Sequence, residues 1–170
     1  MSLSLTLAVA FLPIPLMHLW LHALLPWWRR NVFVFYIFSA CLWILTFRIM
    51  LRVAAYDVVL WQGGSAARLL GLVFVMAGGV AILWSVTALG PRRFFAYAAL
   101  TDAPGTASRV SAGPFRFVPH PAYLGYCTVL LGLLMRNGTV LSVMIFFYLI
   151  ALTPLVILHE ERELQGRLNG

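Results

Sequence analysis

A histidine held between two prolines and a later cluster of carboxylates are the residues of this chain best suited to chemistry. His120 lies in the polar run 113–125, and Glu160, Glu161 and Glu163 follow a long apolar run. An imidazole exchanges protons near neutral pH, and carboxylates hold cations. Ionisable groups at the edge of a hydrocarbon core are rare and usually functional. We therefore expect the two segments to form one site.

The composition predicts which elements must position these residues. Of 170 residues, 62% are hydrophobic and 10% are charged. Soluble domains average about 45–50% apolar and 25% charged residues, so the chain is predicted to be an integral membrane protein. We expect a single membrane domain over residues 1–170, with an all-α, polytopic helix bundle as its fold.

Apolar segments of about 17–25 residues predict about five transmembrane helices. They cover residues 3–25, 32–53, 69–89, 121–135 and 139–158. Pro13 and Pro15 should bend the first helix, and Gly90-Pro91 should end the third. The chain thus divides into three N-terminal spans (1–89), a polar loop (90–119) and a helical hairpin with a charged tail (120–170).

The hairpin and the charge pattern place the two polar segments together. A short turn at 136–138 makes the last two helices antiparallel, which returns the glutamates to the level of His120. With five spans, the polar loop and the tail share one side of the membrane, and that side carries most of the arginines. The positive-inside rule assigns it to the cytoplasm.

The remaining charged residues predict few partners besides the bilayer. The net charge is +7 and every basic side chain is arginine, but these residues form no basic face of a soluble domain, so nucleic-acid binding is not expected. Arg48 and Arg52 should extend toward lipid phosphates, with Asp57 pairing with Arg52. His18 and His22 share a helix face, for which packing is favoured over a metal site. The sequence indicates no oligomeric state.

The run Gly113-Pro114-Phe115-Arg116, then His120-Pro121-Ala122-Tyr123-Leu124-Gly125, and then Glu160-Glu161 resembles a known superfamily. It contains the isoprenylcysteine carboxyl methyltransferases and the phospholipid methyltransferases, which are membrane enzymes that use S-adenosylmethionine. The resemblance covers about residues 84–165. It implies that the polar loop and the hairpin hold the cofactor through Gly113, Arg116, His120, Pro121, Tyr123, Gly125, Glu160 and Glu161.

The same resemblance implies a catalytic role for Arg116, His120 and Glu161. Pro119 stands where the family usually has arginine, and Arg116 or Arg109 could partly replace it. The expected acceptor is lipophilic, either a phospholipid amine or an isoprenylcysteine-type carboxylate, and the short tail favours the phospholipid type or a bacterial member. The expected location is a bacterial inner membrane, with the active site facing the cytoplasm.

Two other classes of function remain open. A membrane reductase of the sterol type would use NADPH, although the sequence has no clear nucleotide fingerprint. A non-catalytic lipid-binding or transport protein would fit the prolines within helices, although no inverted repeat is visible.

Overall fold

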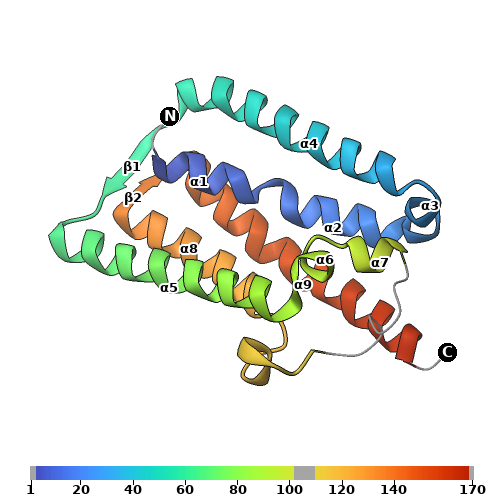
Figure 1. Cartoon of the computed structure of the whole chain (residues 1–170). Helices are drawn as coiled ribbons and strands as arrows, with labels where there is room; N and C mark the ends of the chain where they lie inside the picture. Colours follow the sequence, from blue (N-terminus) through green and yellow to red (C-terminus); the bar gives the residue numbers. More distant parts are fainter. Residues whose placement is uncertain (1–2, 102–109, 169–170) are drawn as a thin grey trace.

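The computed structural model describes residues 3–101 and 110–168, and these residues form a helical bundle with one small two-stranded sheet (Figure 1). In chain order, the elements are α1 (Leu3–Phe11), α2 (Pro13–Ala23), α3 (Leu25–Arg30), α4 (Val32–Val53), η1 (Ala54–Tyr56), β1 (Val59–Gln62), α5 (Ser65–Leu89), α6 (Pro91–Phe94), α7 (Tyr97–Thr101), η2 (Gly113–Arg116), α8 (Pro121–Arg136), β2 (Asn137–Thr139) and α9 (Val140–Leu168).

Four helical stretches of the described chain are long and apolar enough to cross a membrane. They are Leu5–Ala23, Val32–Tyr56, Ser65–Leu89 and Val140–Gln165. The fifth predicted span is the apolar helix α8, which has 16 residues and is therefore only about 24 Å long. The all-α membrane bundle is thus confirmed, with four long helices and one helix shorter than a typical span.

Proline and glycine end the helices where the sequence predicted. The first span is interrupted at Leu12, between α1 and α2, and the buried Pro13 begins α2. Gly90 caps α5 with φ of 75°, a backbone conformation that glycine adopts without strain. Pro121 occupies the first turn of α8, where the missing N–H costs no helical hydrogen bond.

Helices α5 and α8 approach each other closely through glycines. A Cβ atom on Gly78 would lie 2.6 Å from the carbonyl oxygen of Gly125, and one on Gly132 would lie 2.5 Å from that of Gly71. Neither distance is compatible with a side chain, so small residues at these points permit the contact. This pairing fixes α8, which carries His120 at its N-terminal end.

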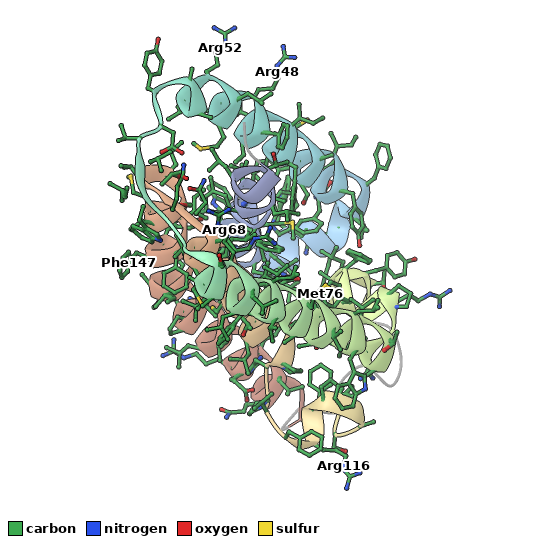
Figure 2. All side chains as sticks on the ribbon, turned by 90° about the vertical axis from the view of Figure 1, so that its left-hand side faces the viewer. Arg48, Arg52, Arg68, Met76, Arg116 and Phe147 are labelled. Carbon is green, nitrogen blue, oxygen red and sulfur yellow. The ribbon has the colours of Figure 1, made fainter. Side chains whose placement is uncertain are left out.

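The other end of the bundle differs from the sequence expectation. Residues 59–62 and 137–139 form the antiparallel strands β1 and β2, where the sequence analysis predicted only a short turn at 136–138. The Asp57 carboxylate accepts a hydrogen bond from the Leu141 backbone N–H at 3.0 Å, so Asp57 caps α9. The expected pairing of Asp57 with Arg52 is therefore wrong. Arg48 and Arg52 are exposed and extend away from the bundle (Figure 2).

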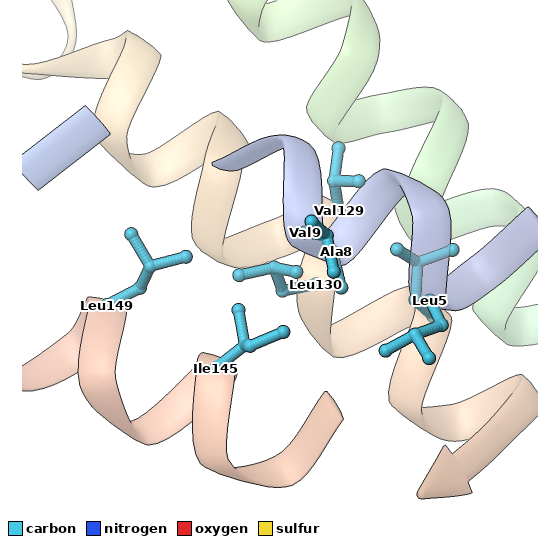
Figure 3. Packing of buried hydrophobic residues seen from close by; sticks show 8 residues of the cluster. Leu5, Ala8, Val9, Val129, Leu130, Ile145 and Leu149 are labelled. Atoms are coloured by element: carbon cyan, nitrogen blue, oxygen red, sulfur yellow. The ribbon is translucent and has the colours of Figure 1, made fainter. Parts of the chain in front are cut away.

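Two apolar clusters hold the remaining helices. The first joins α1, α8 and α9 and contains Leu5, Ala8, Val9, Val129, Leu130, Leu133, Ile145 and Leu149 (Figure 3). The second joins α2, α3 and α4 to the segment of α6 and α7, and contains Leu21, Leu25, Trp28, Phe35, Ala96 and Leu100. Helix α9 packs along α2 and continues through Pro154 as far as Leu168.

Candidate functional site

The predicted juxtaposition of His120 with the glutamates is present in the structure. His120 is the residue before α8 and lies between Pro119 and Pro121, while the glutamates lie in the last turns of the antiparallel helix α9. The His120 Nε2 atom is 2.9 Å from Glu161 Oε1, and its Nδ1 atom is 3.5 Å from Glu160 Oε2. Hydrogen bonding to Glu160, and then to Glu161, raises the pKa of His120 against the opposing effect of burial.

Tyr123 adds a hydroxyl to this cluster from the first turn of α8. Its hydroxyl donates a hydrogen bond to Glu160 Oε1 and lies 2.8 Å from His18 Nδ1. Tyr123 is three residues beyond His120, so both side chains share one face of the chain as it enters α8. The carboxylate of Glu160 is thereby held by an imidazole and a phenol at once.

Helix α2 supplies two histidines that the sequence did not assign to the site. His22 Nδ1 is 2.6 Å from Glu163 Oε2, and both His18 and His22 have a ring nitrogen 3.9 Å from Glu160 Oε1. Their spacing of four residues signalled a shared helix face, but the sequence did not indicate what that face would meet. Three of the four histidines and three of the five acidic residues of the chain therefore gather in one cluster.

One buried nitrogen in this cluster makes no hydrogen bond within the described chain. It is His22 Nε2, which lies 3.9 Å from Glu160 Oε1, and the His22 side chain is 10% exposed. A buried polar atom without a partner is costly, and such atoms are frequent where a water or a ligand binds. No set of three or more histidine, cysteine or acidic residues in the described ranges has an arrangement suited to a metal ion.

The cluster forms one wall of a cavity of about 930 Å³. His18, His22, His120, Tyr123, Glu160 and Glu161 line its polar side. Its apolar side comes from α1, α2 and α4 and includes Phe11, Ile14, Met17, Phe35 and Trp43. Ligand pockets commonly measure about 300–1,000 Å³, with apolar walls and a few convergent polar groups. The cavity has this character.

A short segment of α6 and α7 closes another side of the cavity. Phe94, Phe95 and Ala99 line it. The segment is fastened to the bundle by two hydrogen bonds, from the Tyr36 hydroxyl to the Phe95 carbonyl at 3.0 Å and from Arg29 Nε to the Ala99 carbonyl at 3.1 Å. Ala96, between the two helices, has φ of 61°, which is unfavourable for any residue with a side chain.

Three of the predicted site residues are placed differently from the rest. Gly113 and Gly125 are outside the cavity lining, and Gly125 instead packs against Gly78 and Ile82 of α5. Arg116 borders the cavity, but its side chain is exposed and points away from the bundle (Figure 2). Cofactor contacts from these residues remain predictions. Arg109, considered as a substitute for the family arginine, lies outside the described residues.

The other five predicted site residues all line the cavity: His120, Pro121, Tyr123, Glu160 and Glu161. The aromatic residues Phe115 and Phe117 line it as well. The structure therefore brings six of the eight predicted residues to the cavity wall, although the Arg116 side chain points outward, with His18 and His22 beside them. Their chemical roles remain predictions.

Comparison with known proteins gives one match. No curated protein matches the chain, and no solved structure matches it. The family model described as phospholipid methyltransferase matches residues 66–167, which is more than half of the chain and runs from α5 to the end of α9. The matched range contains His120, Tyr123 and all three glutamates of the cluster, whereas His18 and His22 precede it. The chain belongs to the phospholipid methyltransferase family.

Proposed function

We propose that this protein transfers a methyl group from S-adenosylmethionine to the amine of a phospholipid headgroup at the cytoplasmic face of the membrane. One observation carries the proposal: residues of the family match form a cluster of imidazole, phenol and carboxylates on the wall of a cavity that also has an apolar side. Membership in a methyltransferase family favours this reaction over the reductase and the non-catalytic protein that the sequence left open.

The residues of the cavity suit S-adenosylmethionine, which carries a sulfonium, an ammonium, a carboxylate and an adenine ring. Glu160 and Glu161 would hold the positively charged groups, and Phe115, Phe117 or Tyr123 would stack on the ring. His22 Nε2, which makes no hydrogen bond, fits a binding site because a ligand can supply one. When bound, the cofactor supplies a methyl group on a cationic sulfur.

The apolar side of the cavity suits a lipid acceptor. Phe11, Ile14 and Met17 come from helices that form a candidate membrane span. This wall of the cavity is therefore apolar, as the acyl chains of the bilayer are. A headgroup amine held beside the cluster would be aligned with the methyl group. Such alignment of two reactants supplies much of the rate of a displacement reaction.

An amine is favoured over a carboxylate acceptor by the charges near the cluster. Carboxylates attract an ammonium and repel another carboxylate. Of the two arginines on the cavity wall, Arg116 directs its side chain away from the bundle. An isoprenylcysteine-type carboxylate would thus be repelled by Glu160 and Glu161, with little positive charge nearby to offset the repulsion.

The distribution of arginines supports a cytoplasmic site. Arg29, Arg30, Arg92 and Arg93 belong to α3 and α6, at the end of the bundle where the cluster lies (Figure 1). Arg48, Arg52, Arg68 and Arg136 lie toward the end of β1 and β2. Each end therefore has four of these eight arginines. Arg116 and Arg162 add to the arginines at the end where the cluster lies, and an excess of arginine favours the cytoplasm.

Mass spectrometry of the lipid product tests the proposal. Purified protein in nanodiscs containing phosphatidylethanolamine is incubated with isotope-labelled S-adenosylmethionine. We expect the headgroup to gain one labelled methyl group at a time. A parallel incubation with nanodiscs of phosphatidylglycerol, which has no amine, is the matched control. Absence of label in phosphatidylethanolamine, or equal labelling of both lipids, would contradict the proposal.

A further inference from the structure

An ammonium must lose a proton before its nitrogen can be methylated. The two histidines of α2 line the cavity in which the acceptor would bind. We infer that His18 accepts the proton of the acceptor ammonium and that Tyr123 passes a proton from His18 to Glu160. This inference rests on the proposed methyl transfer to an amine. It assigns a catalytic role to a residue that lies outside the family match and that the sequence did not place in the site.

The hydrogen bonds of Tyr123 determine which nitrogen of His18 carries the proton. The Tyr123 hydroxyl has a single hydrogen, which it donates to the carboxylate of Glu160. The contact of 2.8 Å between that hydroxyl oxygen and His18 Nδ1 must therefore use a hydrogen on Nδ1. A neutral imidazole carries one N–H, so His18 Nε2 holds a lone pair and can act as a base.

His18 is one of the residues that line the cavity, as are Met17 and the polar cluster. Within the described part of the chain, the hydrogen bond of His18 is made at Nδ1, and Nε2 makes none. A headgroup bound in this cavity would supply the partner that Nε2 lacks.

The cluster also provides a route by which the proton can leave. When His18 takes a proton on Nε2, the hydrogen on Nδ1 can move to the Tyr123 oxygen as the Tyr123 hydrogen moves to Glu160. Glu160 Oε2 lies 3.5 Å from His120 Nδ1, and His120 Nε2 lies 2.9 Å from Glu161. The proton moves on when His120 is neutral, with Nδ1 accepting from Glu160 as the hydrogen on Nε2 passes to Glu161. Glu161 is 27% exposed, so the route ends at a carboxylate that reaches water.

The step balances in atoms and charge. The ammonium transfers a proton to His18 Nε2 and becomes an amine with a free electron pair. That pair forms the new nitrogen–carbon bond as the bond from the methyl carbon to the cationic sulfur breaks, and the sulfur leaves as a neutral thioether. The product is an ammonium with one more methyl group. It can lose its next proton to His18 in a second round once the hydrogen on Nε2 has left and Nδ1 has regained its hydrogen.

The pH dependence of the reaction provides the first test. The charged or titratable groups around His18 are His22 on α2, Tyr123 and Tyr126 on α8, and Glu160 on α9. Replacing His18→Gln removes the base but preserves size and polarity. We expect the rate of phosphatidylethanolamine methylation at pH 7 to fall about 10²–10⁴-fold, the usual contribution of a general base.

The rate of the His18→Gln variant should then rise about tenfold per pH unit, because the amine must lose its proton to solvent. The His159→Gln variant is the matched control, since His159 is exposed on α9 and lies outside the cavity lining. It should retain the parent rate and pH profile. A His18→Gln variant with the parent profile would overturn the inference and leave the proposed methyl transfer intact.

Nitrogen NMR of the histidine rings gives a readout that does not depend on activity. In protein labelled with ¹⁵N-histidine, the signal lost in His18→Gln identifies His18. We expect that signal to show a hydrogen on Nδ1 and none on Nε2. Tyr123→Phe removes the acceptor for the Nδ1 hydrogen, so the hydrogen should then leave Nδ1 for Nε2 in part of the molecules.

The two measurements separate the possible failures. A hydrogen on Nε2 of His18 in the parent protein would overturn the inference, whatever the activity. A parent protein with the expected tautomer but no transfer to phosphatidylethanolamine would contradict the proposed function, and the base role with it. Retained ¹⁵N signals of the other three histidines in His18→Gln would show that the variant is folded.

Discussion

Helix α8 takes part in two interfaces that are built in opposite ways. Toward α5 it presents glycines, and backbone meets backbone with no room for a Cβ atom at Gly78 or Gly125. Toward α2 and α9 it presents Tyr123, whose hydroxyl contacts a histidine and a glutamate beside a cavity of about 930 Å³. The comparison indicates that close packing on one face holds the helix while the other face leaves space for ligands.

The two interfaces should therefore respond differently to substitution. A change on the glycine face alters packing and should lower stability, because a close-packed interior adapts poorly to added volume. A change that preserves size on the polar face should mainly lower activity, with a smaller effect on stability that depends on pH. Four substitutions test this difference.

Among these four predictions, the strongest effect is expected for Glu160→Gln. This carboxylate accepts the Tyr123 hydroxyl and lies within 4 Å of His18, His22 and His120. Loss of its charge should lower kcat/KM for lipid methylation about 100-fold, which corresponds to about 2.7 kcal/mol. The rate assay in nanodiscs measures this. A variant that loses less than threefold would show that Glu160 is only structural.

On the glycine face, Gly78→Ala should lower the free energy of unfolding by about 1–3 kcal/mol. Its Cβ atom would meet the Gly125 carbonyl oxygen at 2.6 Å. The neighbouring Gly79→Ala variant is the control, because nothing lies within 4 Å of a Cβ atom there, and it should gain about 0.5–1 kcal/mol. Denaturant unfolding in detergent compares the two. Equal stabilities would contradict the close α5–α8 contact.

A smaller, pH-dependent effect is expected at His120. Its pKa is raised, so its protonated form stabilises the folded protein fully below about pH 6.5 and loses this effect as pH rises through the raised pKa. The difference in Tm between the parent and His120→Gln should therefore be largest near pH 6 and disappear in alkaline solution. A difference that grows with pH would mean that His120 is not held as an imidazolium by Glu160 and Glu161.

The smallest effect is expected far from the cluster, at the end that carries β1 and β2. Asp57→Ala removes the cap of α9 and should lower the free energy of unfolding by about 1 kcal/mol. The rate of methylation should be unchanged, because the cap lies at the opposite end of α9 from Glu160. A large loss of activity with a normal Tm would indicate coupling between the two ends of the bundle.

Features that are local in the sequence could be predicted. The lengths of the apolar runs indicated the helices, Pro13 and Gly90 indicated where they end, and the short turn indicated that His120 would meet Glu161. These inferences depend on length, backbone chemistry and antiparallel geometry, which act over a few residues or over one hairpin.

Features that join distant segments could not be predicted. β1 pairs with β2 across more than seventy residues, and His22 meets Glu163, which is 141 positions further along the chain. No local pattern encodes which face of α2 turns toward α9. The outward direction of Arg116 was likewise invisible, since the sequence placed it only next to the site.

The proposed function requires that S-adenosylmethionine binds at the cluster of His18, His22, His120, Tyr123 and the glutamates. Calorimetric titration of the cofactor into the parent protein and Glu160→Gln, both in detergent, measures this binding. We expect saturable binding to the parent and affinity at least about tenfold weaker in the variant, a difference of about 1.4 kcal/mol. Equal affinity in the two proteins, or no binding to the folded parent, would contradict it.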